Sequence, residues 1–223
     1  MKNLNAKLFI WIFAGLTLLF VVLAKWLYGV PKDADWLLFK FLSTVVAADY
    51  ATWLLFSKWA WKWRVWKGWL VPYPNLNGTW KGVIRSNWIN PQTGQRIEAI
   101  PALLVIKQSF SRVTCRLVTA ESSSESFAES FELEPESGAK LLVYSYRNEP
   151  RPSVKERSEP HEGTVKLRVG EDKKRRLDGK YWNDRSKPVS GEMEFAFWKA
   201  EQVTTLSREF LEHPMRGLCH RQE

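Results

Sequence analysis

The chain has 223 residues, a formal net charge of +9 and 13 tryptophans. Its length allows one soluble domain and a short membrane segment. The two cysteines, Cys115 and Cys219, match no metal-ligand spacing and no disulfide framework, which excludes a disulfide-stapled secreted domain and favours a reducing compartment. A basic, tryptophan-rich chain suits nucleic acid, a nucleotide ligand or an anionic membrane, or it has only a solvated basic surface.

The first apolar segment covers Leu8–Tyr28. At about 1.5 Å of rise per residue, a helix of this length crosses a hydrocarbon core about 30 Å thick. Its charged residue, Lys25, stands near the end and can reach the interface, where Trp26 also fits. The segment is too long for a secretory signal peptide and lacks a cleavage site. It therefore predicts a transmembrane helix.

A second apolar segment covers Trp36–Ser57 and contains Lys40 and Asp49. Lys40 stands near its start and can reach the interface, whereas Asp49 lies deeper and needs a partner or water. Asp49 either hydrogen-bonds to the other helix, or it forms a polar contact that assembles several copies or lines a water path. The two segments predict a transmembrane hairpin; a helix hairpin buried in a soluble protein is the alternative.

Basic residues flank this hairpin on one side. Two lysines precede the first segment, four basic residues follow the second within residues 58–69, and the connecting residues 29–35 hold one lysine beside two aspartates. Because the cytoplasmic flanks of membrane helices carry the excess of lysine and arginine, we expect both termini and the following domain in the cytoplasm.

Residues 58–69 interleave tryptophans with cations. Indole rings favour the headgroup layer of a membrane, and cations favour anionic lipids. Aromatic and basic interleaving also occurs in nucleic-acid sites, but directly after a membrane helix the lipid interpretation is favoured. The segment predicts an interfacial anchor, with three rings selected as its membrane-contacting residues: Trp59, Trp61 and Trp63.

After Pro74 the pattern changes to strands separated by turn residues. Apolar and polar residues alternate with period two, and no helical period appears before Lys199. Eight consecutive antiparallel strands predict an up-and-down barrel, because closure removes exposed sheet edges. The fold class is thus a membrane-anchored all-β protein with domains at 1–71, 72–200 and 201–223, the last a short helix and tail. The expected strands are Gly78–Trp88, Ile97–Phe110, Arg112–Ala120, Ser126–Leu133, Ala139–Arg147, Gly163–Val169, Arg176–Arg185 and Ser190–Trp198.

One rim of this barrel is expected to be polar. In a meander, the ends of odd strands and the starts of even strands lie at the same rim, and inward polar groups there are costly unless something pairs with them. Aromatic rings stack on bases and arginine binds phosphate, so the set suits a nucleotide; a hydrated mouth with Arg185 paired to an acidic neighbour is the alternative. The inward set is Ser86, Trp88, Tyr144, Tyr146, Tyr181, Asn183 and Arg185.

Charge is unevenly placed along the domain. Residues 121–136 hold six glutamates and no lysine or arginine, and residues 147–187 are strongly basic. These segments form either opposite faces of a solvated surface or a head-to-tail contact between copies. No catalytic loop, nucleophile motif or metal cluster appears, and the three histidines are scattered, so we expect neither an enzyme nor a cofactor.

The segment Asn75–Trp88, NLNGTWKGVIRSNW, adds a resemblance. A strand that opens with GTWKG after two membrane helices and leads into a barrel of this length resembles the cyclic-dinucleotide receptor that acts as membrane effector in bacterial CBASS anti-phage operons. This resemblance covers nearly the whole chain in architecture, and its local motif is Gly78, Trp80, Gly82, Ser86 and Asn87.

The resemblance implies a mechanism and a ligand. A synthase activated by phage makes a cyclic dinucleotide, the barrel binds it, and the receptors form homo-oligomers that disrupt the bacterial inner membrane and cause abortive infection. The implied partners are this ligand and membrane lipid, with no DNA or RNA. Arg185 is the first candidate for the phosphates, Arg85 the second if a bulge turns it inward, and the expected base-stacking rings are Trp88, Tyr146 and Tyr181.

Two other functions stay open from the sequence. A GxW strand also opens lipocalin-type barrels, so the domain could be a membrane-tethered carrier of an apolar ligand. A constitutive scaffold with a filled barrel is the second alternative.

Overall fold

The computed structural model describes residues 6–27, 38–89, 94–134, 136–154, 159–170, 175–185 and 188–203. These residues form two compact units. The helical unit contains the residues up to Tyr73 together with Ser109–Ser111, and the barrel unit contains the remaining residues from Pro74 onward. The helix expected in the C-terminal tail lies outside the described residues, as does the connection between the two apolar segments.

The helical unit is built on α1 (Ala6–Leu27) and α2 (Leu38–Lys58), followed by the short 3₁₀ helices η2 (Ala60–Lys62) and η3 (Arg64–Trp66). Among the described residues one helix, Lys7–Leu27, is long and apolar enough to cross a membrane, and few of its residues are buried. α2 has the length for a span but is less apolar, since Lys40 and Asp49 interrupt it.

Asp49 faces the other helix. Thr17 on α1 donates a hydrogen bond from Oγ1 to Oδ2 of Asp49, with a length of 2.8 Å. The structure thus contains the interhelical hydrogen bond that was one of the two interpretations of Asp49. Such a contact favours a defined pairing of the two helices, because it satisfies one oxygen of a partly buried carboxylate,.

The tryptophan-rich segment divides into exposed and buried rings. Trp59 and Trp63 are 63% and 62% exposed, whereas Trp61 is only 3% exposed. Trp61 packs in an apolar cluster with Leu70 and Val71. The prediction of Trp61 as a membrane-contacting ring is therefore wrong, because the 3₁₀ turn at residues 60–62 directs it into the core of the helical unit.

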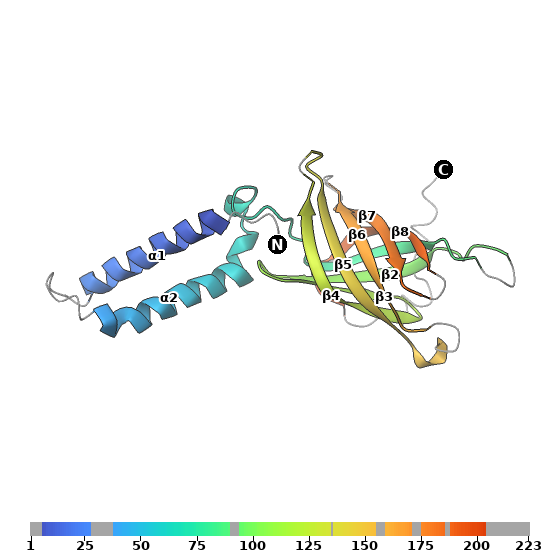
Figure 1. Cartoon of the computed structure of the whole chain (residues 1–223), viewed down its shortest axis with the longest axis horizontal. Helices are drawn as coiled ribbons and strands as arrows, with labels where there is room; N and C mark the ends of the chain where they lie inside the picture. Colours follow the sequence, from blue (N-terminus) through green and yellow to red (C-terminus); the bar gives the residue numbers. More distant parts are fainter. Residues whose placement is uncertain are drawn as a thin grey trace. The chain divides into compact units, whose positions relative to one another are not determined.

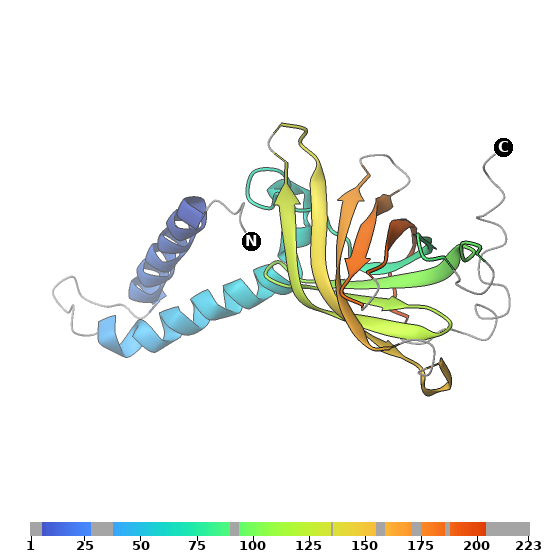
Figure 2. The same ribbon diagram turned by 45° about the vertical axis from the view of Figure 1, so that its right-hand side comes forward.

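The barrel is closed, with its strands hydrogen-bonded in chain order and β8 paired back to β1. Every pairing is antiparallel, so the predicted eight-stranded up-and-down barrel is confirmed; Figures 1 and 2 show it from two directions. The strands are β1 (Gly78–Ser86), β2 (Ile100–Gln108), β3 (Val113–Val118), β4 (Ser122–Leu133), β5 (Lys140–Pro150), β6 (His161–Val169), β7 (Arg176–Asn183) and β8 (Ser190–Lys199).

β4 begins earlier than the sequence predicts. The serine run at residues 122–124 was expected to lie between two strands. Instead it belongs to β4 and pairs with residues 148–150 of β5. Thr119 closes the preceding turn by donating its backbone N–H to the carbonyl of Ser122 over 2.9 Å. The extended pairing lengthens β4 and β5 on the side where the polar rim is expected.

The barrel interior follows the predicted alternation. Trp80, Leu104, Leu142, Val165 and Leu177 are at most 1% exposed. Close packing also explains why position 179 on β7 is a glycine. A Cβ at this position would collide with the backbone carbonyl of Lys166 on the neighbouring strand. The interior below the polar rim is therefore filled by apolar side chains.

The acidic and basic segments meet within the same barrel wall. Lys166 on β6 lies 3.9 Å from a carboxylate oxygen of Glu132 and 4.0 Å from one of Glu134. Arg168 lies 4.0 Å from Glu134. Part of the charge asymmetry is thus balanced inside one chain, which weakens the case for a head-to-tail contact based on charge alone.

Candidate functional site

The strand register brings the predicted polar rim together. Tyr146 on β5 pairs with Gly163 on β6, and Gly163 pairs with Asn183 on β7. Tyr181, two residues before Asn183, shares its face of the sheet and hydrogen-bonds to the side chain of Ser86 on β1. Residues predicted from three separate strands therefore occupy one end of the barrel.

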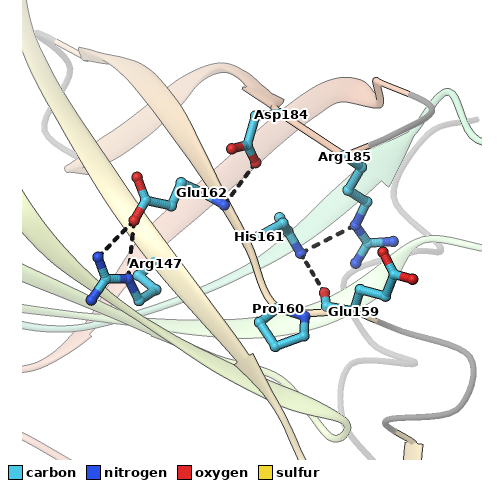
Figure 3. A pocket seen from close by; sticks show the side chains of 7 residues that line it. All are labelled: Arg147, Glu159, Pro160, His161, Glu162, Asp184 and Arg185. Carbon is cyan, nitrogen blue, oxygen red and sulfur yellow. Dashed lines mark hydrogen bonds and ion pairs between the residues drawn. The ribbon is translucent and has the colours of Figure 1, made fainter.

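A cavity of about 330 Å³ opens at this rim, between the end of β5, the start of β6 and the residues after β7. Its size lies near the lower end of the range for small-molecule pockets, roughly 300–1,000 Å³. Figure 3 shows its lining, in which Arg185 and His161 point toward one another. The lining residues are Arg147, Glu159, Pro160, His161, Glu162, Asp184 and Arg185.

Two groups compete for one nitrogen of His161. Arg185 donates from Nε to Nδ1 of His161 over 3.1 Å, and the carbonyl oxygen of Glu159 lies 3.0 Å from the same Nδ1. Burial lowers the pKa of His161, and the Arg185 charge lowers it further against the raising effect of the Glu159 contact. The neutral ring can use Nδ1 either as acceptor or as donor, so only one of the two contacts is satisfied at a time.

Three other charged residues of the cavity, Arg147, Glu162 and Asp184, are linked by hydrogen bonds. Arg147 donates from Nε and Nη2 to one carboxylate oxygen of Glu162, at 3.0 and 2.7 Å. The backbone N–H of Glu162 in turn donates to Oδ1 of Asp184 over 2.8 Å. These contacts place Arg147 and Arg185 on opposite sides of the cavity (Figure 3) and hold the carboxylates in defined positions.

The tyrosines lie beneath the cavity. Tyr146 is 6% exposed and packs edge-to-face against His161, with ring centroids 6.2 Å apart. Tyr144 lies deeper, and its hydroxyl has no hydrogen-bond partner in the part of the chain that the structure describes. Burial raises the pKa of Tyr144, Tyr146 and Tyr181, so all three are neutral phenols at physiological pH.

Two predicted site residues, Arg85 and Asn183, do not line the cavity. Arg85 lies on the outer face, where it pairs with Glu194 at 2.8 Å. The bulge that would turn it inward is absent at Arg85, because the register shift in β1 falls between Thr79 and Trp80. Asn183 accepts a hydrogen bond from the backbone N–H of Val189 over 2.9 Å and so closes the turn after β7.

Trp88 follows the end of β1. Its backbone N–H donates to Oγ of Ser86 over 3.1 Å, and its side chain is half-buried. The cavity lining does not include Trp88, nor does it include Tyr144 or Tyr181. The predicted rim residues thus share one end of the barrel. Of these residues, Arg185 lines the cavity.

Sequence reasoning missed most of the cavity. His161 begins β6 two residues before Gly163 and therefore shares its face, a relation that appears only when the strand is extended backward to His161. Arg147 and Glu162 are paired neighbours on β5 and β6 with outward parity. Asp184 follows β7, where no periodic pattern operates; Arg185 was predicted at the end of this strand but lies two residues beyond it. The alternation of apolar and polar residues in β6 is the sequence signal that could have placed His161 at the rim, if the strand had been extended back to this residue.

These features define a class of protein: a closed β-barrel with a cavity at one rim, joined to an apolar helix that is long enough to span a membrane. Comparison with known families is more specific. The family model described as Cap15, cyclic dinucleotide receptor domain, matches residues 71–196, more than half of the chain. The chain therefore belongs to this family, which confirms the resemblance noted at Asn75–Trp88. A search of curated proteins found no match.

Membership in this family assigns the barrel as a cyclic dinucleotide receptor domain of a CBASS effector. The family is a receptor family rather than a catalytic one. Among the residues that the structure describes, no group of three or more metal-ligating side chains occurs.

Proposed function

We propose that this protein is an anti-phage effector that binds a cyclic dinucleotide at the polar rim of its barrel, oligomerises and disrupts the bacterial inner membrane. The observation that carries the proposal is the coincidence of a cyclic dinucleotide receptor domain with a cavity that contains Arg185 at the predicted rim. The family supports the receptor function, and the cavity supports the proposed position of the ligand.

Arg185 binds a phosphate of the ligand in this proposal. A guanidinium makes charge-assisted hydrogen bonds to phosphate oxygens, which are stronger than its present hydrogen bond to neutral His161,. When the phosphate takes the guanidinium, Nδ1 of His161 becomes able to donate to the carbonyl of Glu159, 3.0 Å away. Ligand binding thereby resolves the competition for Nδ1 instead of leaving a buried nitrogen unsatisfied.

The bases stack on aromatic rings at the rim. Tyr146 and Tyr181 are nearly buried, at 6% and 8% exposure, so a base reaches them only if it enters above His161 or displaces it. Trp88, half-buried beside Ser86, is the third candidate ring. Tyr144 acts as a floor for these residues, because it packs against Tyr146 with centroids 6.5 Å apart.

The helical unit supplies the membrane function. In this proposal α1 and α2 both span the membrane. The exposed rings of Trp59 and Trp63 lie in the headgroup layer, and the barrel is in the cytoplasm. A ligand that binds the assembled form more tightly than the monomer shifts the population toward assembly by that difference in affinity. Clustered hairpins then breach the bilayer.

The test uses the full chain in vesicles of phosphatidylethanolamine and phosphatidylglycerol loaded with a fluorescent dye. We expect at least one of cyclic di-AMP, cyclic di-GMP, cyclic GMP–AMP and cyclic di-UMP to bind and to release the dye, while linear dinucleotides do neither. Binding without release would remove the membrane step. Release without any added ligand would contradict gating, and co-purified lipid with no nucleotide binding would favour the apolar carrier.

A further inference from the structure

The hairpin between β2 and β3 has a tip that belongs to the helical unit. β2 ends at Gln108 and β3 begins at Val113, and these two residues are paired. Gln108 and Arg112 belong to the barrel unit, but the three residues between them, Ser109–Ser111, group with the helices. The chain therefore passes from one unit to the other twice within this hairpin, in addition to the passage at Tyr73–Pro74.

Phe110 occupies the centre of an aromatic cluster in the helical unit. Its ring centroid lies 5.1 Å from that of Phe9 on α1, and 5.0 and 5.8 Å from those of Phe56 and Trp53 on α2. The Phe110 side chain is 6% exposed. Contacts at these distances are favourable in offset and edge-to-face geometry, so one phenylalanine joins both long helices.

The backbone of Phe110 also completes α2. The last four carbonyls of a helix have no partner within the helix. Phe110 donates its backbone N–H to the carbonyl of Ser57 in the last turn of α2 over 3.0 Å. Ser57 is itself only 8% exposed, so this carbonyl receives from the hairpin tip a bond that water would supply at an exposed helix end.

At its base the hairpin is fixed to the segment that leads into β1. The side chain of Gln108 accepts from the backbone N–H of Leu76 over 2.8 Å and donates to the carbonyl of Pro74 over 3.0 Å. Asn77 forms two further bonds with the backbone of Gln108, each 2.7 Å long. Residues 74–77 and the end of β2 are therefore held together as one piece inside the barrel unit.

We propose that Phe110 is the positioning residue through which the barrel acts on the membrane helices. The hairpin tip gives the helical unit a further covalent connection to the barrel unit, in addition to the one at Tyr73–Pro74. Since the base of the hairpin and the segment before β1 are hydrogen-bonded to each other, a displacement of this end of the barrel moves the Phe110 ring, and with it Phe9 and Phe56. The consequence for membrane disruption rests on the proposed function; the attachment itself does not.

The test compares Phe110→Ala with a matched control, Phe127→Ala, in the full chain. Phe127 is 57% exposed on β4 and has no place in the aromatic cluster. Two measurements are made on the same vesicles: affinity for the cyclic dinucleotide that the wild type binds, and dye release at saturating ligand. We expect Phe110→Ala to keep the wild-type affinity within about twofold and to lose dye release by about tenfold or more, while Phe127→Ala matches the wild type in both.

A third measurement is independent of ligand. Hydrogen exchange of the segment 53–58 should accelerate in Phe110→Ala, because the rings of Trp53 and Phe56 lose the aromatic side chain that packs against them, and Phe110→Leu should restore part of the protection. Dye release by Phe110→Ala at the wild-type level would overturn the coupling role while leaving the proposed function intact. If the wild type binds none of the cyclic dinucleotides, the proposed function fails, and unchanged exchange at residues 53–58 would then overturn the attachment as well.

Discussion

The most direct consequence of the rim geometry concerns Arg185→Ala. In the unliganded protein the guanidinium donates to His161 at 3.1 Å, and in the proposed complex it exchanges this bond for one with a phosphate. A hydrogen bond to a charged group contributes about 1.5–3 kcal/mol, and a neutral one about 0.5–1.5 kcal/mol. The net gain on binding is then about 1–2 kcal/mol, which corresponds to a loss of about 5- to 30-fold in affinity when Arg185 is removed.

The assay is titration of the full chain in detergent micelles with the cyclic dinucleotide that the wild type binds. Arg168→Ala is the matched control, because its side chain is 63% exposed and pairs with Glu134 on the barrel wall. Arg185→Lys should lie between the alanine variant and the wild type, since it keeps a charge but loses the planar donor array. Equal affinity of Arg185→Ala and wild type, with unchanged thermal unfolding, would refute the placement of the phosphate at Arg185.

Three further predictions follow from buried groups. Tyr144→Phe removes a buried hydroxyl without a partner in the described part of the chain; we expect a gain of about 1 kcal/mol and a rise of about 3–5 °C in Tm, measured by calorimetry, with ligand affinity unchanged. Burial lowers the pKa of His161, and a dianionic ligand raises it again, so binding takes up a proton; affinity should rise as pH falls from about 7.5 to 5.5, and His161→Gln should abolish this slope. Gly179→Ala places a Cβ against the carbonyl of Lys166; we expect a loss of about 1–3 kcal/mol in denaturant unfolding, whereas Gly15→Ala, where a Cβ has open space on a helix, should lose less,. A stable Gly179→Ala protein, a falling Tm in Tyr144→Phe or a flat pH profile in the wild type would contradict the respective reasoning.

The sequence by itself determined the architecture of the barrel. Period-two alternation in β1, β6, β7 and β8 predicts which side chains face inward, and the buried positions of Trp80, Val165 and Leu177 follow that parity. The meander order then fixes which strand ends share a rim, so the common location of Tyr146, Tyr181 and Asn183 could be predicted. Apolar composition alone also identified α1, because a membrane helix needs length and hydrophobicity but no tertiary partner.

Only the tertiary structure decided the contacts of side chains that lie in turns and at the ends of strands. Trp61 and Trp63 are equivalent in sequence pattern, yet a 3₁₀ turn buries one ring and exposes the other. His161 enters the cavity because β6 begins earlier than its apolar residues indicate. Phe110 was expected at the end of a strand. Instead its ring packs against Phe9 on α1, about a hundred residues earlier in the chain, and against Phe56 on α2, about fifty residues earlier. Local periodicity reports the environment of an element's faces, whereas these positions are set by long-range packing that no local pattern encodes.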